Sequence, residues 1–105
     1  MIDIGVGYYR KTSTPGIFDA TWTTSKLGSK GVGTGTVSGN QLKGFVGKYV
    51  VTYYLPDGSD AGTFDLVIEP TGAAFSLSWS KDGIALYTGV GIETPDGLAI
   101  GFRKI

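Results

Sequence analysis

The side chains in this sequence that could recognise a ligand are mostly aromatic, and the residues that most often carry out chemistry are missing. The 105 residues include no histidine and no cysteine. Histidine is the commonest general base and metal ligand, and both residues supply the usual activated nucleophile pairs. An enzyme built on this chain would therefore depend on tyrosine or carboxylate acids and on the shape of its cavity. We expect no cofactor and no metal.

The aromatic residues occur at alternate positions, as in Phe18-Asp-Ala-Thr-Trp22 and Phe75-Ser-Leu-Ser-Trp79. Residues two apart lie on the same face of a β-strand, so each segment places its rings on one side. Inward-facing rings either fill a core or line a pocket for a small apolar ligand, since Tyr and Trp combine apolar surface with a polar group. The candidate ligand-binding residues are Trp22, Trp79, Tyr49, Tyr53, Phe64 and Phe75.

The charged residues give no catalytic pattern. Asp19, Asp65 and Glu69 alternate with apolar positions and are expected on the solvent side. The loop aspartates fit turns and form no EF-hand calcium loop. The Gly-Val-Gly segments are not followed by a helix, which a phosphate-binding glycine loop requires.

Net charge also excludes one class of partner. Nine Lys and Arg balance nine Asp and Glu, so no overall field attracts nucleic acid. Arg10, Lys11, Arg103 and Lys104 would form a local basic patch if the first and last strands pair, either for solubility and edge protection or for an anionic partner.

Alternation with a period of two dominates the chain and predicts an all-β domain. Turn signals separate the alternating segments; they are Pro56-Asp57-Gly58, Pro70-Thr71-Gly72, Lys81-Asp82-Gly83, Pro95-Asp96-Gly97 and Ser38-Gly39-Asn40. Strands are predicted at residues 5–11, 17–24, 31–38, 48–55, 62–69, 74–80, 86–93 and 98–104. Residues 41–47 are either a ninth short strand or a kinked lead-in to the next one.

Tight turns between sequential strands predict a single domain, residues 1–105, folded as a small antiparallel up-and-down β-barrel of about eight strands. A sandwich is the alternative. Closure would remove exposed strand edges. Glycines within strands would let the barrel bend or make room for Trp22 and Trp79; they are Gly31, Gly33, Gly35, Gly89, Gly91 and Gly101.

An internal echo suggests pseudo-symmetry. Phe18 to Trp22 matches Phe75 to Trp79, and Gly44-Phe45 matches Gly101-Phe102, both at an offset of 57 positions. Gly7-Tyr8-Tyr9-Arg10-Lys11 also resembles Gly101-Phe102-Arg103-Lys104, which predicts that the first and last strands are neighbours. Tandem use of one hairpin unit would explain both echoes, and chance in a glycine-rich sequence is the competing explanation.

Several Gly/aromatic motifs occur in a particular order: Tyr49-Val-Val-Thr-Tyr-Tyr-Leu-Pro-Asp-Gly58, Gly62-Thr63, Phe75 to Trp79, Tyr87-Thr-Gly-Val-Gly91 and Leu98-Ala-Ile-Gly101. This series resembles small bacterial β-barrel proteins that are sometimes labelled fibronectin-binding. The segment from Gly5 to Arg10, with Trp22 and Gly31 to Gly35, resembles the block that usually follows these motifs, so the order is permuted here. A circular permutation or a slice of a tandem array would give this order.

The resemblance implies a calycin-like barrel, related in shape to lipocalins and avidins, that is exported, periplasmic or extracellular, and has a binding role. It transfers no catalytic residues. The sequence shows no recognisable biotin-binding set, so an avidin-like function does not follow from the shape.

The function we expect is that of a non-catalytic binding protein, with a small apolar ligand in the barrel or at its mouth. The alternative is a protein-interaction module, at a cell surface or in a homo-oligomer, with an outer aromatic patch of Tyr8, Tyr9 and Tyr54. A barrel isomerase or cyclase ranks third. The chain contains no window of about 18 apolar residues, so we expect a soluble domain without a helical membrane span.

Overall fold

The computed structural model describes residues 3–105, which form eight strands and one short 3-10 turn. The strands are β1 (Ile4–Lys11), β2 (Ile17–Thr24), β3 (Gly33–Lys43), β4 (Val46–Tyr54), β5 (Asp60–Thr71), β6 (Ala74–Lys81), β7 (Ile84–Thr94) and β8 (Gly97–Lys104). The 3-10 turn η1 (Gly28–Lys30) lies between β2 and β3. The predicted all-β class is confirmed, and each of the eight predicted segments overlaps one strand.

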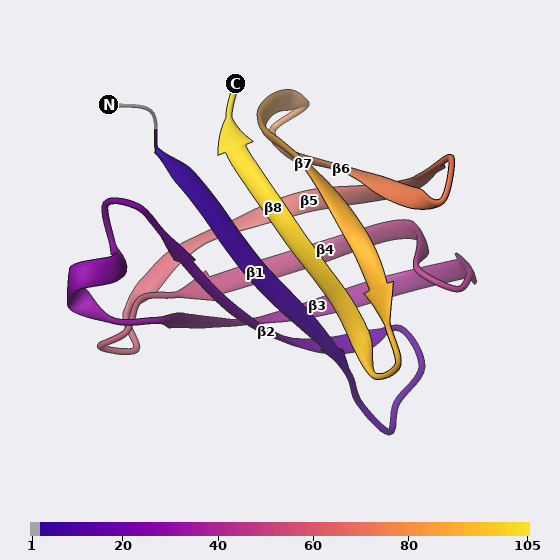
Figure 1. Ribbon diagram of the computed structural model, residues 1–105, viewed down its shortest axis with the longest axis horizontal. Coiled ribbons are helices and arrows are strands. Elements are labelled where there is room, and N and C mark those ends of the chain that lie inside the picture. Colours follow the sequence, from indigo (N-terminus) through magenta and orange to yellow (C-terminus); the bar gives the residue numbers. More distant parts are fainter. Residues whose placement is uncertain (1–2) are drawn as a thin grey trace.

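The strands form a closed antiparallel barrel in which every strand pairs with its neighbours in the sequence. The ring closes between β1 and β8, which lie side by side in Figure 1. Ile4 pairs with Arg103, and Arg10 pairs with Gly97. The predicted up-and-down barrel and the predicted pairing of the terminal strands are therefore confirmed. Among residues 3–105, no helix has the length and hydrophobicity needed to cross a membrane.

The same pairing contradicts the predicted basic patch. Because β1 and β8 are antiparallel, Arg103 lies beside the start of β1 and Arg10 lies beside the start of β8. Six residues of strand separate the two positions, a distance of about 20 Å. The basic residues near the two chain ends thus lie at opposite ends of the barrel.

The turn between β3 and β4 also differs from the prediction. Residues 38–40 lie within β3, and Lys43 pairs with Val46 around a turn at Gly44 and Phe45. Gly44 has a φ of 56°, which favours glycine. Residues 41–47 are therefore the end of β3, the turn and the start of β4, not a ninth strand. Gly39 does not form a turn. It allows β3 and β4 to lie close together, since a Cβ there would lie 2.3 Å from the Lys48 carbonyl oxygen.

The barrel interior combines large and small side chains on adjacent strands. Aliphatic residues that are at most 2% exposed form its middle, among them Val37, Val51, Leu66, Ile68, Leu77 and Leu98. A Cβ on Gly33 would lie 2.5 Å from the Trp22 ring, and one on Gly89 would lie 3.0 Å from the Trp79 ring. These two glycines make room for the two tryptophans, as the sequence predicted.

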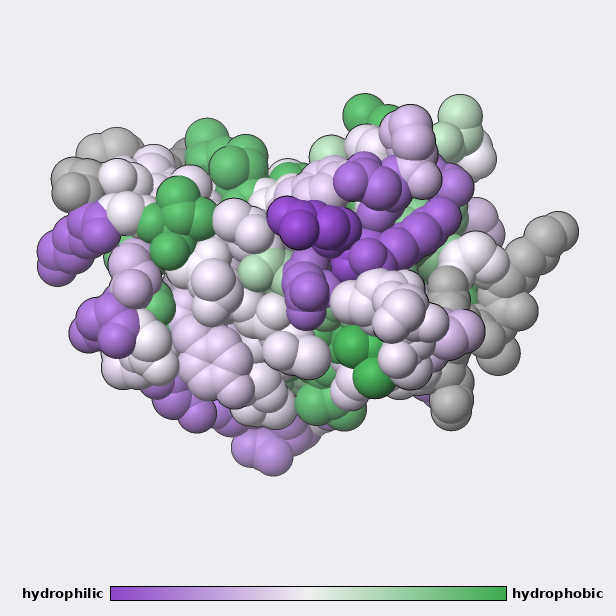
Figure 2. All heavy atoms as spheres, turned by 90° about the horizontal axis from the view of Figure 1, so that it is seen from below, coloured by the Kyte–Doolittle hydropathy of each residue, from purple (hydrophilic) through white to green (hydrophobic). Residues whose placement is uncertain are grey.

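The outer face carries the polar half of the alternating pattern. Asp19, Asp65 and Glu69 are exposed, as predicted. On the side of the molecule shown in Figure 2, hydrophobic atoms form separate small groups among neutral and hydrophilic ones.

The internal echo has only a partial structural counterpart. Phe18 and Phe75 begin the inner faces of β2 and β6, and Trp22 and Trp79 lie toward the opposite ends of those strands. Phe45, in contrast, lies in the β3–β4 turn, whereas Phe102 lies within β8. Gly44-Phe45 and Gly101-Phe102 therefore occupy different kinds of position in the fold.

Candidate functional site

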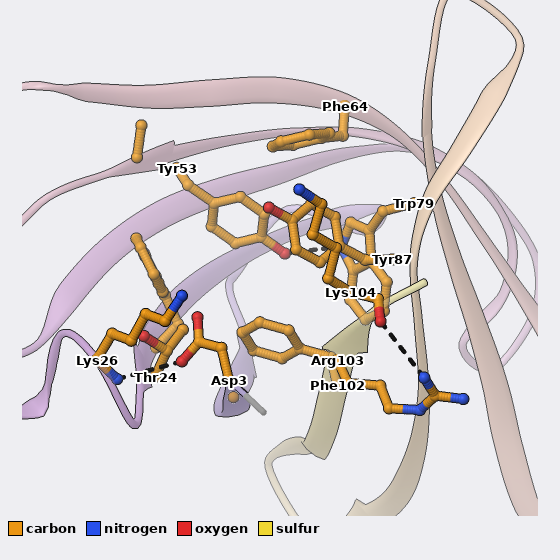
Figure 3. A pocket seen from close by; sticks show the side chains of 13 residues that line it. Asp3, Thr24, Lys26, Tyr53, Phe64, Trp79, Tyr87, Phe102, Arg103 and Lys104 are labelled. Atoms are coloured by element: carbon orange, nitrogen blue, oxygen red, sulfur yellow. Dashed lines mark hydrogen bonds between the residues drawn. The ribbon is translucent and has the colours of Figure 1, made fainter. Parts of the chain in front are cut away.

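A cavity of about 290 Å³ occupies the end of the barrel where β1 begins and β8 ends (Figure 3). We call this the open end. The volume equals the share of liquid volume taken by about ten water molecules, and it lies at the lower limit for small-molecule pockets. The cavity is therefore large enough for a compact ligand of the size of a substituted benzene ring.

Five aromatic side chains surround the cavity, and we call them the aromatic circuit: Tyr53, Phe64, Tyr87, Phe102 and Trp79. The distances between successive ring centroids are 6.1 Å, 5.7 Å, 6.3 Å and 5.7 Å in that order. The indole N–H of Trp79 donates to the Tyr53 hydroxyl at 2.9 Å and closes the circuit. Ring separations of this size stabilise edge-to-face and tilted aromatic pairs, so the wall of the cavity is a connected unit.

Two strand pairings hold rings against the barrel wall and keep them out of its centre. Phe102 pairs with Gly5 across β1 and β8, and a Cβ on Gly5 would lie 2.1 Å from Phe102 Cζ. Trp22 pairs with Gly33 across β2 and β3 and contacts Tyr53 at 5.5 Å between ring centroids. Because the glycines have no side chain, the rings lie on their backbone and the centre stays open.

Three polar groups meet at the inner wall of the cavity. The Tyr53 hydroxyl accepts from Trp79 and shares a 2.5 Å hydrogen bond with the Tyr9 hydroxyl. Burial raises the pKa of Tyr53 to about 12 and raises the pKa of Tyr9 well above its ordinary value. Both phenols therefore keep their protons at neutral pH.

Charged residues lie at the mouth of the cavity. Asp3 accepts from the Ser25 hydroxyl at 2.8 Å and from the Lys26 backbone N–H at 3.2 Å. The hydrogen bond from Ser25 lowers the pKa of the Asp3 carboxyl, so this group is ionised at neutral pH. Arg103 points away from the rings in Figure 3 and donates to the Lys104 carbonyl at 3.4 Å.

The other end of the barrel, which we call the closed end, is filled by a second group of rings. Phe18 lies 5.3 Å from Phe45 and 5.8 Å from Tyr49 between centroids, and Phe45 lies 6.0 Å from Phe75. Phe45 is only 1% exposed. The Tyr49 hydroxyl donates to the Phe45 carbonyl at 2.9 Å, which fixes the turn that carries this ring.

The structure thus divides the six predicted site residues. Trp22, Trp79, Tyr53 and Phe64 line the cavity, whereas Tyr49 and Phe75 belong to the closed end. Sequence reasoning missed Tyr87 and Phe102, which complete the aromatic circuit. Strict alternation places Tyr87 on the same face of β7 as Gly89, and Phe102 on the same face of β8 as Ile100.

The predicted outer patch of Tyr8, Tyr9 and Tyr54 does not form. Tyr9 is 1% exposed and points into the core, because it shares the inner face of β1 with Gly5 and Gly7. The Tyr8 hydroxyl is bonded to Thr94 and Asp96 beside the β7–β8 turn. Tyr54 lies on β4, and β2 and β3 separate it from Tyr8.

The arrangement suits binding by ring contacts and a small number of hydrogen bonds. Within the part of the chain that the structure describes, no three acidic side chains are placed to hold a metal ion. Comparison of the chain with protein-family models, with curated proteins and with solved structures finds no match.

Proposed function

We propose that this barrel is a non-catalytic binding protein that takes a small apolar ligand into the cavity at its open end. The observation that carries the proposal is the open space of about 290 Å³ inside a continuous aromatic wall. Small-molecule sites are typically concave, mostly apolar and equipped with a few polar groups, which describes this cavity.

Binding of toluene, followed by ligand-observed NMR, tests this proposal. The wild-type protein is expected to bind toluene. Ala61 lines the cavity, so Ala61→Phe should fill the space and weaken binding by at least about tenfold.

Val90→Phe is the matched control, because it adds a similar ring at a position that is 61% exposed on the outer face. This variant should bind toluene as the wild type does. Equal binding by Ala61→Phe and the wild type, or no binding by the wild type, would contradict the proposal.

The resemblance to bacterial Gly/aromatic-rich barrels supports a binding role of this kind. Likeness to lipocalins and avidins and export from the cell belong to the same proposal. Secretion of the natural protein into the periplasm or medium, measured by cell fractionation, would support the export part, and retention in the cytoplasm would contradict it.

A protein-interaction module is the second candidate, and one feature of the outer face favours it. Val6 and Val90 are 55% and 61% exposed and flank Gly101 across β1, β8 and β7. Ile92, which is 66% exposed, extends this apolar strip along β7. A homo-oligomer that covers the strip would be detected by light scattering and disrupted by Val90→Asp, while a monomer at all concentrations would argue against it.

A further inference from the structure

The three polar groups at the inner wall of the cavity hold three protons but make only two hydrogen bonds among themselves. Tryptophan can only donate, and Trp79 donates to the Tyr53 oxygen. The single hydrogen bond between Tyr9 and Tyr53 uses one of their two hydroxyl protons. One hydroxyl proton of this group is therefore left without an acceptor inside it.

Burial decides which of the two phenols carries the proton that has no acceptor within the group. Tyr9 is 1% exposed, and a buried donor without a partner costs about 1–3 kcal/mol. Tyr53 lines the cavity and is less buried than Tyr9. The favourable arrangement therefore has Tyr9 donating to Tyr53 and Tyr53 directing its own proton into the cavity.

Three other aromatic side chains that line the cavity offer no competing donor. The indole N–H of Trp22 is committed to the Thr34 carbonyl at 2.9 Å. Phe64 and Phe102 contribute no polar atoms. In this arrangement the Tyr53 oxygen accepts from both Trp79 and Tyr9, and such chains strengthen the bond that the hydroxyl itself donates. Its raised pKa keeps the donor protonated across the neutral range.

We propose that the cavity selects small aromatic molecules that carry a hydrogen-bond acceptor, such as a carbonyl oxygen, and that the Tyr53 hydroxyl donates to this acceptor. The inference rests on the proposed function and adds the chemical class of the ligand. The aromatic circuit holds the ring of the ligand, and the Tyr53 proton fixes its orientation.

Two probes of the same shape test the proposal: acetophenone, and α-methylstyrene, in which a methylene group replaces the carbonyl oxygen. Dissociation constants are measured by NMR titration for the wild type and Tyr53→Phe. The substitution should weaken acetophenone about three- to tenfold more than α-methylstyrene, as expected for one neutral hydrogen bond. This double comparison cancels the different hydration of the two probes. Equal weakening of both probes would overturn the inference.

Two further variants identify the donor. Tyr9→Phe removes one of the two hydrogen bonds that the Tyr53 oxygen accepts, so the preference for acetophenone should persist and become slightly weaker. A stronger preference in this variant would show that Tyr53 normally donates to Tyr9, which would overturn the inference. Tyr87→Phe should also keep the preference, and its loss there would assign the donor to Tyr87.

A measurement without substitution of Tyr53 covers the case in which Tyr53→Phe does not fold. Fluorination of tyrosine makes the phenol a stronger donor. In the Tyr87→Phe background, 3-fluorotyrosine labelling should therefore lower the infrared carbonyl stretching frequency of bound acetophenone. An unchanged frequency would overturn the inference. Failure of both probes to bind the wild type would instead refute the proposed function itself.

Discussion

The two ends of this barrel use the same kind of side chain and reach opposite results. At the closed end, Phe45 enters the barrel from the β3–β4 turn and packs against Phe18 and Phe75. At the open end, every ring that lines the cavity comes from a strand and lies against the wall. A barrel of about eight strands is just wide enough to be filled by side chains or to hold one small ligand. The ring of Phe45, which enters from the β3–β4 turn, is therefore the main reason that the closed end is filled and the open end holds a cavity.

The ends also differ in how their polar groups are satisfied. At the closed end, the Tyr49 hydroxyl donates to a backbone carbonyl of the turn that it supports. At the open end, Tyr9, Tyr53 and Trp79 leave one proton without an acceptor among them. The closed end is thus complete by itself, and the open end offers a donor to whatever enters it.

The largest expected difference between the ends is the cost of deleting a phenylalanine ring. Phe18→Ala should destabilise the protein by about 3–5 kcal/mol, because Phe18 is 2% exposed and its neighbours cannot close the space. Phe64→Ala should cost only about 1–2 kcal/mol, because Phe64 is partly exposed and already borders the cavity. Urea denaturation gives both values. Equal losses would mean that the open end is packed as tightly as the closed end.

Alkaline titration gives the next largest effect. Burial raises the pKa of Tyr53 and that of Tyr49 to about 12, whereas tyrosine in an unfolded chain ionises near 10. The unfolded chain therefore loses these protons first. The contribution of the two tyrosines to the free energy of unfolding is fully present below about pH 10 and is lost as the pH rises toward 12. Tyr53 alone should contribute a loss of roughly 2–3 kcal/mol over this range.

Urea midpoints measured from pH 8 to pH 12 separate the contributions of the two ends. Tyr53→Phe and Tyr49→Phe should each reduce the alkaline slope relative to the wild type. A reduction by Tyr49→Phe alone would show that water enters the open end freely enough for Tyr53 to ionise normally.

Much of this fold can be predicted from the sequence because its main signals are local. Alternation places Phe64, Leu66 and Ile68 on one face of a strand, and Pro-Asp-Gly sequences favour a turn over continuation of the strand. The similarity of the terminal strands also predicted the closure between β1 and β8. Four of the six predicted site residues lie at the cavity because their strands present alternate positions inward.

The errors arise where the conformation depends on a partner strand. Gly39 is typical of a turn, but it lies within β3 because Lys48 and Tyr49 approach it closely. Tyr8 and Tyr9 are adjacent, and only the pairing of β1 with β2 and β8 decides which of them faces inward. Tyr49 belongs to the closed end and Tyr53 to the cavity because Phe45 packs at the closed end. The position of Phe45 depends on the β3–β4 turn, which was predicted at residues 38–40 and lies at residues 44 and 45.

The smallest expected effects come from one substitution made at both ends. A Cβ on Gly39 would lie 2.3 Å from the Lys48 carbonyl oxygen and 2.7 Å from Tyr49 Cα, so Gly39→Ala must push two backbones apart. We expect a loss of about 1–3 kcal/mol. A Cβ on Gly5 would instead meet the Phe102 ring, which can swing into the cavity, so Gly5→Ala should cost less than about 1 kcal/mol. Because the displaced ring occupies the ligand space, toluene binding should weaken in Gly5→Ala and persist in Gly39→Ala. Urea denaturation and NMR titration measure the two effects, and unchanged toluene binding in Gly5→Ala would show that Phe102 does not move into the cavity.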